Sequence, residues 1–87
     1  MRLDLFLKAS GLIKRRTLAN ELCDRGFVSV NGTKSKAGKE VKIGDIIEFK
    51  VGKYSYKLEV LSLPVKKGNR LGGESFRIIE SNVEEDT

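Results

Sequence analysis

The sequence predicts an α+β domain in which short N-terminal helices pack on an antiparallel sheet. Apolar residues recur at helical spacing in the first quarter of the chain, and from residue 27 onward β-rich runs alternate with Asn-Gly and Gly-Asp turn pairs. The 87 residues suffice for one small domain with a thin core, and they are too few for an enzyme with a deep cleft. We expect a single domain over residues 1–80 and an acidic tail over residues 81–87.

The first helix is expected over about residues 2–9. Leu3, Phe6 and Leu7 stand at positions i, i+3 and i+4, which places them on one helical face. The pair Ser10-Gly11 follows, and glycine is common just past a helix end. The sequence therefore predicts a helix of about two turns that buries one apolar face.

The second helix is expected over about residues 14–25, because Leu18 and Leu22 follow a helical repeat and Gly26 supplies a C-terminal stop. Cys23 flanks this apolar stripe, where a buried structural thiol is the usual outcome. Three consecutive cations would occupy the first turn, although a helix N-terminus already carries partial positive charge. Natural sequences tend to break a local rule where function requires it, so this helix start indicates a functional role.

The rest of the chain predicts strands. The run over residues 27–30 leads into Asn31-Gly32, the strongest short hairpin signal because both turn positions need positive φ, and a short polar return strand over 33–36 follows. The later strands are expected over residues 46–51, 54–63 and about 76–79, with a glycine-rich loop over 66–73 before the last of them.

The charge balance favours a polyanionic partner. Seventeen Lys and Arg residues against twelve Asp and Glu residues give a formal net charge of +5. Residues 1–44 hold ten of the basic and four of the acidic side chains, a net charge of +6, whereas the remainder of the chain carries −1. The N-terminal half is therefore the candidate reader of a polyanion.

The cations at the start of the second helix are the main candidates for binding, together with Arg2 on the first helix. The planar fork of arginine bonds phosphate oxygens at two points, so converging arginines would form an anion-binding surface between the helices. The predicted RNA-binding residues are Arg2, Asp4, Lys8, Lys14, Arg15, Arg16, Lys34 and Lys36. The alternative is that these lysines and arginines only keep a small protein soluble.

The members of this set have different expected roles. Arg2, Arg15 and Arg16 are expected to contact phosphates, while the lysines add long-range attraction. Asp4 has two alternatives: it stabilises the N-terminus of the first helix, or it orients a neighbouring arginine toward a phosphate.

Catalysis finds little support in the sequence. There is no histidine for acid–base work, no GxxxxGK[ST] phosphate loop, and a single cysteine, which excludes an internal disulfide and the usual zinc arrangements. We therefore expect no enzyme, no metal and no cofactor. The longest apolar stretch falls far short of the ~20 residues of a membrane span, and no secretory signal pattern is visible, so a cytoplasmic location without membrane partners is expected.

The expected nucleic acid is structured RNA rather than DNA. Tyr54, Tyr56 and Phe49 are too few and too regularly alternated to predict a stacking platform for single strands. The basic helix is short and has few base-reading Asn or Gln residues, so it does not predict a DNA-recognition helix. Recognition of RNA through its shape and phosphates fits better.

The chain resembles a known family over about residues 1–51. The residues that carry the resemblance are Arg2-Leu3-Asp4, Leu7, Ser10, Arg15 or Arg16, Ala19, Leu22, Gly26, Val28, Val30-Asn31-Gly32, Val41 and Gly44-Asp45. In order and spacing they are similar to the small RNA-binding domain named after small-subunit ribosomal protein four, the S-four domain. This resemblance implies an α-L fold, in which two or three short helices pack on a small, strongly bent antiparallel sheet.

The run over residues 12–19 further resembles the RqcP-type factors of ribosome-associated quality control, which are similar in turn to the heat-shock ribosome-recycling proteins. The resemblance implies binding to ribosomal RNA and peptidyl-tRNA on obstructed large ribosomal subunits, while an RqcH-type elongation factor adds a C-terminal alanine tail. It also implies that Arg2, Asp4, Arg15 and Arg16 touch the RNA. The acidic tail differs from the basic C-terminal extension of the heat-shock proteins.

Three other functions stay open at this point. The chain could recycle stalled large subunits, as the heat-shock proteins of the family do. It could be the accessory RNA-binding subunit of an RNA-modifying enzyme, or a protein–protein adaptor that uses the C-terminal hairpin and the segment around Phe76.

Overall fold

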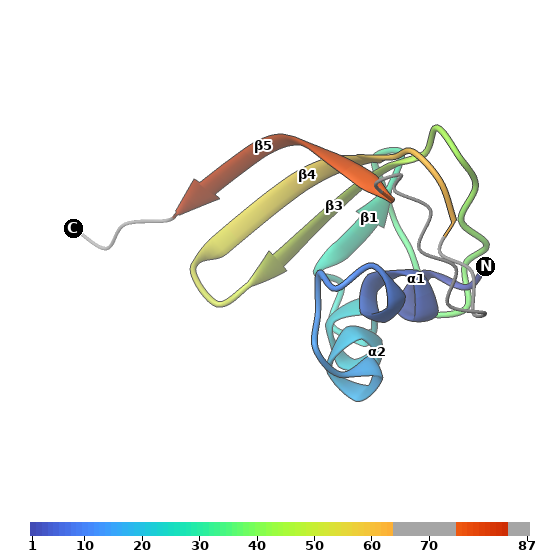
Figure 1. Ribbon diagram of the computed structural model, residues 1–87. Helices are drawn as coiled ribbons and strands as arrows, with labels where there is room; N and C mark the ends of the chain where they lie inside the picture. Colours follow the sequence, from blue (N-terminus) through green and yellow to red (C-terminus); the bar gives the residue numbers. More distant parts are fainter. Residues whose placement is uncertain (64–74, 84–87) are drawn as a thin grey trace.

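The computed structural model describes residues 1–63 and 75–83, in which two helices precede five strands (Figure 1). The elements are α1 (Leu3–Ala9), α2 (Arg16–Asp24), β1 (Val28–Val30), β2 (Thr33–Lys34), β3 (Ile46–Val51), β4 (Tyr54–Val60) and β5 (Phe76–Val83). The predicted α+β class is confirmed. The loop expected over 66–73 and the tail residues 84–87 lie outside the described residues.

The strands form one antiparallel sheet in the order β2-β1-β3-β4-β5. Asn31 and Gly32 join β1 to β2 with φ values of 53° and 84°, so the predicted hairpin turn is confirmed. The Asn31 side chain also accepts a hydrogen bond from the backbone N–H of Ile46 at 2.9 Å and donates to Asp45 at 3.1 Å. The turn is thereby tied to the start of β3.

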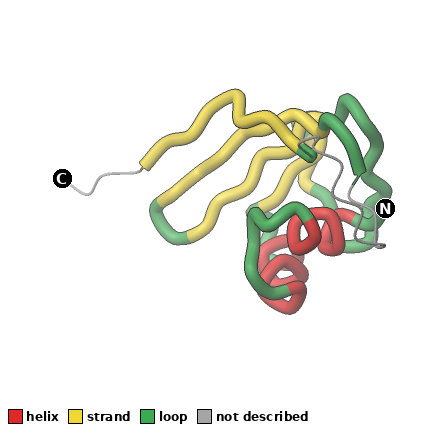
Figure 2. The backbone as a smooth tube through the Cα atoms, in the orientation of Figure 1, coloured by secondary structure: helices red, strands yellow, loops and turns green. Residues whose placement is uncertain are grey.

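The core lies between the helices and one face of the sheet. Leu3, Phe6 and Leu7 are fully buried, as the helical spacing predicted. Alternate residues of the sheet face them, and these are Val28, Val30, Ile47, Phe49, Leu58 and Val60. Figure 2 shows the helical pair on one side of the sheet, while the long strands β3, β4 and β5 extend beyond it.

The second helix starts later than predicted. It begins at Arg16, Arg15 is the N-cap residue in extended conformation, and Lys14 precedes both. The prediction of three cations in the first helical turn was therefore wrong, because only Arg16 is inside the helix. The first turn still contains no acidic residue and no side-chain cap.

The buried face of α2 also differs from the prediction. It consists of Ala19, Leu22 and Cys23, whereas Leu18 is 38% exposed. The burial of Cys23 is confirmed. Ala19 and Cys23 are small, so burying them lets α2 pack against the core at short range, whereas the larger Leu18 remains partly exposed.

Two strand ends differ from the expectations. β4 ends at Val60 instead of residue 63, and β5 continues to Val83, so residues 81–83 belong to the sheet and not to a tail. The pairing of Val83 with Tyr54 explains the longer strand. Backbone pairing with β4 overrides the low strand propensity of polar residues such as Ser81 and Asn82.

Candidate nucleic-acid interface

The helices α1 and α2 meet at a buried carboxylate. Asp4 lies in the first turn of α1 and is fully buried. The backbone of this turn is fixed by the segment after β2, because Leu3 N donates to Lys39 O at 2.8 Å and Asp4 N donates to Ala37 O at 3.2 Å. The position of Asp4 is therefore set by the fold around it.

Three side chains donate toward this carboxylate. Arg2 approaches from the N-terminal side of α1, with Nε at 3.3 Å from Oδ1 and Nη2 at 3.4 Å from Oδ2. From α2, Arg16 Nε lies 3.3 Å and Asn20 Nδ2 lies 3.2 Å from Oδ2. Arg16 and Asn20 are one helical turn apart, so both reach the same oxygen. We call Arg2, Asp4, Arg16 and Asn20 the Asp4 cluster.

The Asp4 cluster orders two arginines without fully neutralising them. A buried carboxylate is costly unless charged partners and hydrogen bonds offset its desolvation. Arg2, Arg16 and Asn20 all hydrogen-bond Oδ2, whereas the buried Oδ1 accepts no hydrogen bond from the described residues and has the Arg2 Nε at 3.3 Å as its charged neighbour. The arginine side chains remain 52% and 49% exposed. Two cations against one carboxylate leave one positive charge in excess, so the cluster can still attract an anion.

An open hollow of about 470 Å³ lies over the Asp4 cluster, and it is lined by Arg2, Asp4, Arg16, Thr17, Asn20, Glu21 and Asp24. Arg16 donates from Nε to Asp4 Oδ2 at 3.3 Å, and its side chain is 49% exposed at the edge of the hollow. The planar guanidinium fork of arginine suits a phosphate. Glu21 and Asp24 lie further along α2 and repel phosphate, which favours binding at the arginine end of the hollow.

Of the predicted arginines, Arg15 is not in this hollow. Its backbone caps α2 and its side chain is exposed, as are those of Lys14 and Lys8. The predicted convergence therefore holds for Arg2 and Arg16, while Arg15 and Lys14 lie in the connection between the helices.

The two predicted lysines after the first hairpin have different surroundings. Lys34 in β2 lies against Gly26, with its side chain within 3.6–3.8 Å of the position that a Cβ on Gly26 would take. It is therefore next to the C-terminal end of α2, away from Arg16, where a cation complements the helix dipole. Lys36 directly precedes Ala37, the partner of the first turn of α1, and so lies on the Arg2 side.

The sequence reasoning missed Asn20. A single polar residue on a short helix reads as an ordinary surface residue, yet Asn20 contacts the buried carboxylate. Its spacing of four residues from Arg16 was a usable signal, because side chains at i and i+4 share a helical face.

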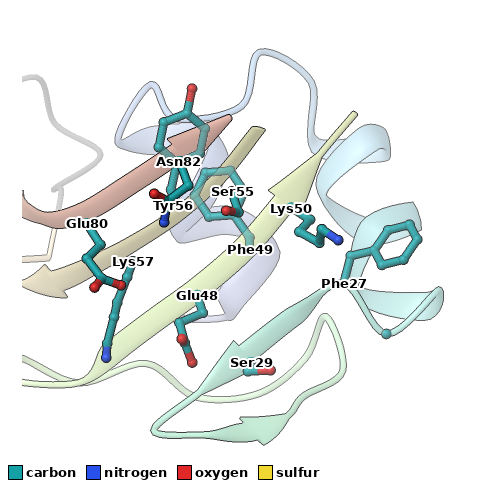
Figure 3. Close-up of a pocket in the computed structure, with 11 residues that line it drawn as sticks. Phe27, Ser29, Glu48, Phe49, Lys50, Ser55, Tyr56, Lys57, Glu80 and Asn82 are labelled. Atoms are coloured by element: carbon teal, nitrogen blue, oxygen red, sulfur yellow. The ribbon is translucent and has the colours of Figure 1, made fainter. Parts of the chain in front are cut away.

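A second hollow, of about 360 Å³, lies on the face of the sheet away from the helices (Figure 3). One cross-strand row runs through it, with Lys57 of β4 directly opposite Glu48 of β3 and Glu80 of β5. Ser55 and Asn82 form a neighbouring pair, and Phe27 lies at one end of the hollow. The row places one lysine between two carboxylates, so this face is less suited to phosphate than the Asp4 cluster is.

Cys23 is a poor nucleophile in this environment. Burial, with smaller contributions from the charges of Asp4 and Asp24, raises the pKa of its thiol to about 11. The thiol is therefore protonated at neutral pH. Among the helices of the described residues, none has the length and apolar character to cross a membrane.

A helical pair on one face of an antiparallel sheet, with half-exposed arginines held on a buried carboxylate, defines a small anion-binding domain. The family described as "S4 domain" matches residues 1–47, which is more than half of the sequence. The chain belongs to the S4 domain family.

Curated relatives and solved structures agree with this assignment. The chain is 49% identical over 63 residues, 72% of each chain, to the protein of Halalkalibacterium halodurans named "RQC P-site tRNA stabilizing factor". A protein of that name from Streptococcus pneumoniae is 37% identical over 86 residues, 98% of each chain. The structure of Heat Shock Protein 15 from Vibrio cholerae, described as trimeric, matches with a TM-score of 0.77 and 28% identity, covering 90% of this chain and 80% of that one. The predicted resemblances to both groups are confirmed.

Proposed function

We propose that this chain is a non-catalytic RNA-binding factor of ribosome-associated quality control. It binds ribosomal RNA and stabilises peptidyl-tRNA on obstructed large ribosomal subunits in the cytoplasm, where an RqcH-type elongation factor adds the alanine tail. The observation that carries the proposal is the Asp4 cluster, which presents Arg2 and Arg16 at the junction of α1 and α2. The names of the relatives support the choice of RNA and pathway.

The cluster has the chemistry for holding folded RNA. Arg2 and Arg16 reach Asp4 from two different elements, so their spacing is fixed by the packing of α1 against α2. Guanidinium groups held at a fixed distance bind phosphates that have a matching spacing. Structured RNA is recognised largely through its shape and its phosphates. Lys8, Lys14, Arg15, Lys34 and Lys36 add attraction at longer range and contact fewer fixed positions.

Substitution of Arg16 by alanine tests the proposal. The change removes a phosphate contact, so binding should weaken by about 1–3 kcal/mol, which corresponds to roughly 5- to 150-fold. Co-sedimentation with large ribosomal subunits that carry peptidyl-tRNA gives the measurement. The charge reversal Arg16→Glu should abolish co-sedimentation.

A matched control is Arg77→Ala, because Arg77 lies on β5 and forms a comparable ion pair with Glu59 at 2.8 Å. Arg77→Ala removes one positive charge, as Arg16→Ala does. A larger loss of binding in Arg16→Ala than in Arg77→Ala would therefore be due to a specific contact and not to the change in net charge. Co-migration of the Arg16→Ala protein at the wild-type level would refute the assignment.

A second candidate function is recycling of stalled large subunits, which the match to Heat Shock Protein 15 favours. A reconstituted reaction distinguishes the two functions. A quality-control factor increases the yield of tailed peptidyl-tRNA, whereas a recycling factor clears the subunit of its tRNA. An accessory role beside an RNA-modifying enzyme would instead give a stable catalytic partner in a pull-down.

A further inference from the structure

The helix-facing side of the sheet is uncovered where β3, β4 and β5 extend beyond the helices (Figure 1). A groove of about 380 Å³ lies there between the strands and the connection from α1 to α2. Its lining includes Leu12 from the connection and Val51, Tyr54, Tyr56, Phe76 and Ile78 from the strands. We call this groove the tyrosine groove. It does not share a lining residue with the hollow over the Asp4 cluster.

An aromatic row forms the floor of the tyrosine groove. Tyr54 and Tyr56 alternate along β4, so both rings lie on one face of the sheet, with centroids 6.5 Å apart and planes within 17° of parallel. Tyr56 also packs on the buried Phe49 at 5.2 Å, whereas Tyr54 is 47% exposed. The regular alternation, which the sequence reasoning took as evidence against stacking, is what places the rings together.

No cation is among the described residues that line this groove, and the cations nearest in the sequence are exposed. Lys53 directly precedes Tyr54 in the hairpin turn, and the exposed Lys14 and Arg15 follow Leu12 in the helix connection. The carboxylates of the described part of β3, β4 and β5 belong to the opposite face, and these are Glu48, Glu59 and Glu80.

We infer that the tyrosine groove binds one unpaired nucleobase of a structured RNA, stacked on the half-exposed ring of Tyr54, beside the hairpin turn that carries Lys53. A flat aromatic floor accepts the face of any base, and flanking cations accept its backbone. The inference rests on the proposed function, since RNA is the partner in both.

Intrinsic fluorescence reports on this groove directly. The chain has two tyrosines, both in the groove, and no tryptophan. Titration with an RNA hairpin that carries an unpaired loop should quench the tyrosine emission, while a blunt duplex of the same stem should leave it unchanged. Tyr54→Leu should weaken hairpin binding about tenfold, and Tyr54→Phe should stay within about twofold because the ring remains.

A parallel binding measurement with end-labelled RNA separates the two proposals. Binding of hairpin and duplex with equal affinity and no quenching would overturn the tyrosine groove as a site and leave the proposed function standing. Arg16→Ala should weaken both RNAs alike while keeping the preference for the hairpin. Absence of binding by either RNA would overturn the proposed function and this inference with it.

Two further outcomes bear on the occupant of the groove. Quenching that grows with protein concentration in the absence of RNA would mean that a second copy fills the groove. Equal hairpin affinity of Tyr54→Leu and wild type, in variants with unchanged circular dichroism, would mean that the tyrosine ring contributes nothing to RNA binding. Either result overturns the nucleobase assignment.

Discussion

The helix-facing side of the sheet has two regions that differ in what covers them. In the covered region, Val28, Ile47 and Leu58 are fully buried beneath the helices. In the open region, Tyr54 is 47% and Val83 52% exposed, although both lie on paired strands. The same antiparallel pairing therefore builds a core where helices cover it and a surface where they do not.

The comparison shows that burial, and with it the stabilisation of the fold, is concentrated in one part of the sheet, while another part leaves apolar side chains exposed. The covered region gains free energy from buried apolar area, about 25 cal/mol per Å². The open region relies on backbone pairing and aromatic contacts, so its side chains can change with little loss of stability. Exposed apolar groups that cost little to change are the ones that selection can use for binding.

The largest expected effect tests this division directly. Phe6→Ala removes a fully buried ring between α1 and the sheet and should lower the free energy of unfolding by about 3–5 kcal/mol. Tyr54→Ala in the open region should lower it by about 1 kcal/mol or less. Urea denaturation followed by circular dichroism gives both values. Equal losses for the two variants would show that the open region is part of the core.

The next largest effect concerns Asp4, the buried carboxylate of α1, which is one of the helices that cover the sheet. Asp4→Asn keeps the shape of the side chain and removes the charge that holds Arg2 and Arg16, so unfolding should become easier by about 1–3 kcal/mol. RNA binding should weaken as well, even though the net charge becomes more positive. Filter binding measures the affinity, and denaturation measures the stability.

The control for Asp4→Asn is Glu48→Gln on the outer face of β3, which is exposed and changes the net charge equally. Long-range attraction alone would strengthen RNA binding in both variants. Tighter binding by Asp4→Asn would therefore contradict the positioning role of Asp4.

Much of this fold could be predicted from the sequence, because local patterns encode it. Two local patterns each predicted one structure, and both predictions are confirmed. The helical spacing of Leu3, Phe6 and Leu7 predicted α1, and the Asn31-Gly32 pair predicted the first hairpin turn. The start of α2 could not be read in the same way. Lys14 and Arg15 have good helix propensity, and the extended conformation of Arg15 is set by the connection from α1.

The candidate site could be predicted only in part. The sequence identified Arg2 and Asp4, but the choice between Arg15 and Arg16 depends on the helix start, since adjacent residues point about 100° apart. Asn20 and the tyrosine groove depend on tertiary packing. Strand alternation tells which residues share a face, and it cannot tell how far the helices extend over that face.

The smallest expected effect probes the covered region by pH. Burial raises the pKa of Cys23 to about 11 from an ordinary value of 9.0. Between these values the unfolded chain loses the thiol proton while the folded chain keeps it, so stability is unaffected below pH 9 and falls as pH rises above it. The expected contribution is roughly 1 kcal/mol per pH unit.

A Cys23→Ala variant isolates this contribution, because all other titrating groups are common to both proteins. The difference in unfolding free energy between wild type and variant should be constant from pH 7 to 9 and should shrink toward pH 11, as wild type alone loses stability through the thiol. Alkylation of the Cys23 thiol should be slow in the folded protein, where the thiol is buried, and fast in urea, where it is exposed. A difference in unfolding free energy that stays constant to pH 11 would mean that the thiol ionises equally in the folded and unfolded states. Cys23 would then be more accessible to water than its 3% exposed surface indicates.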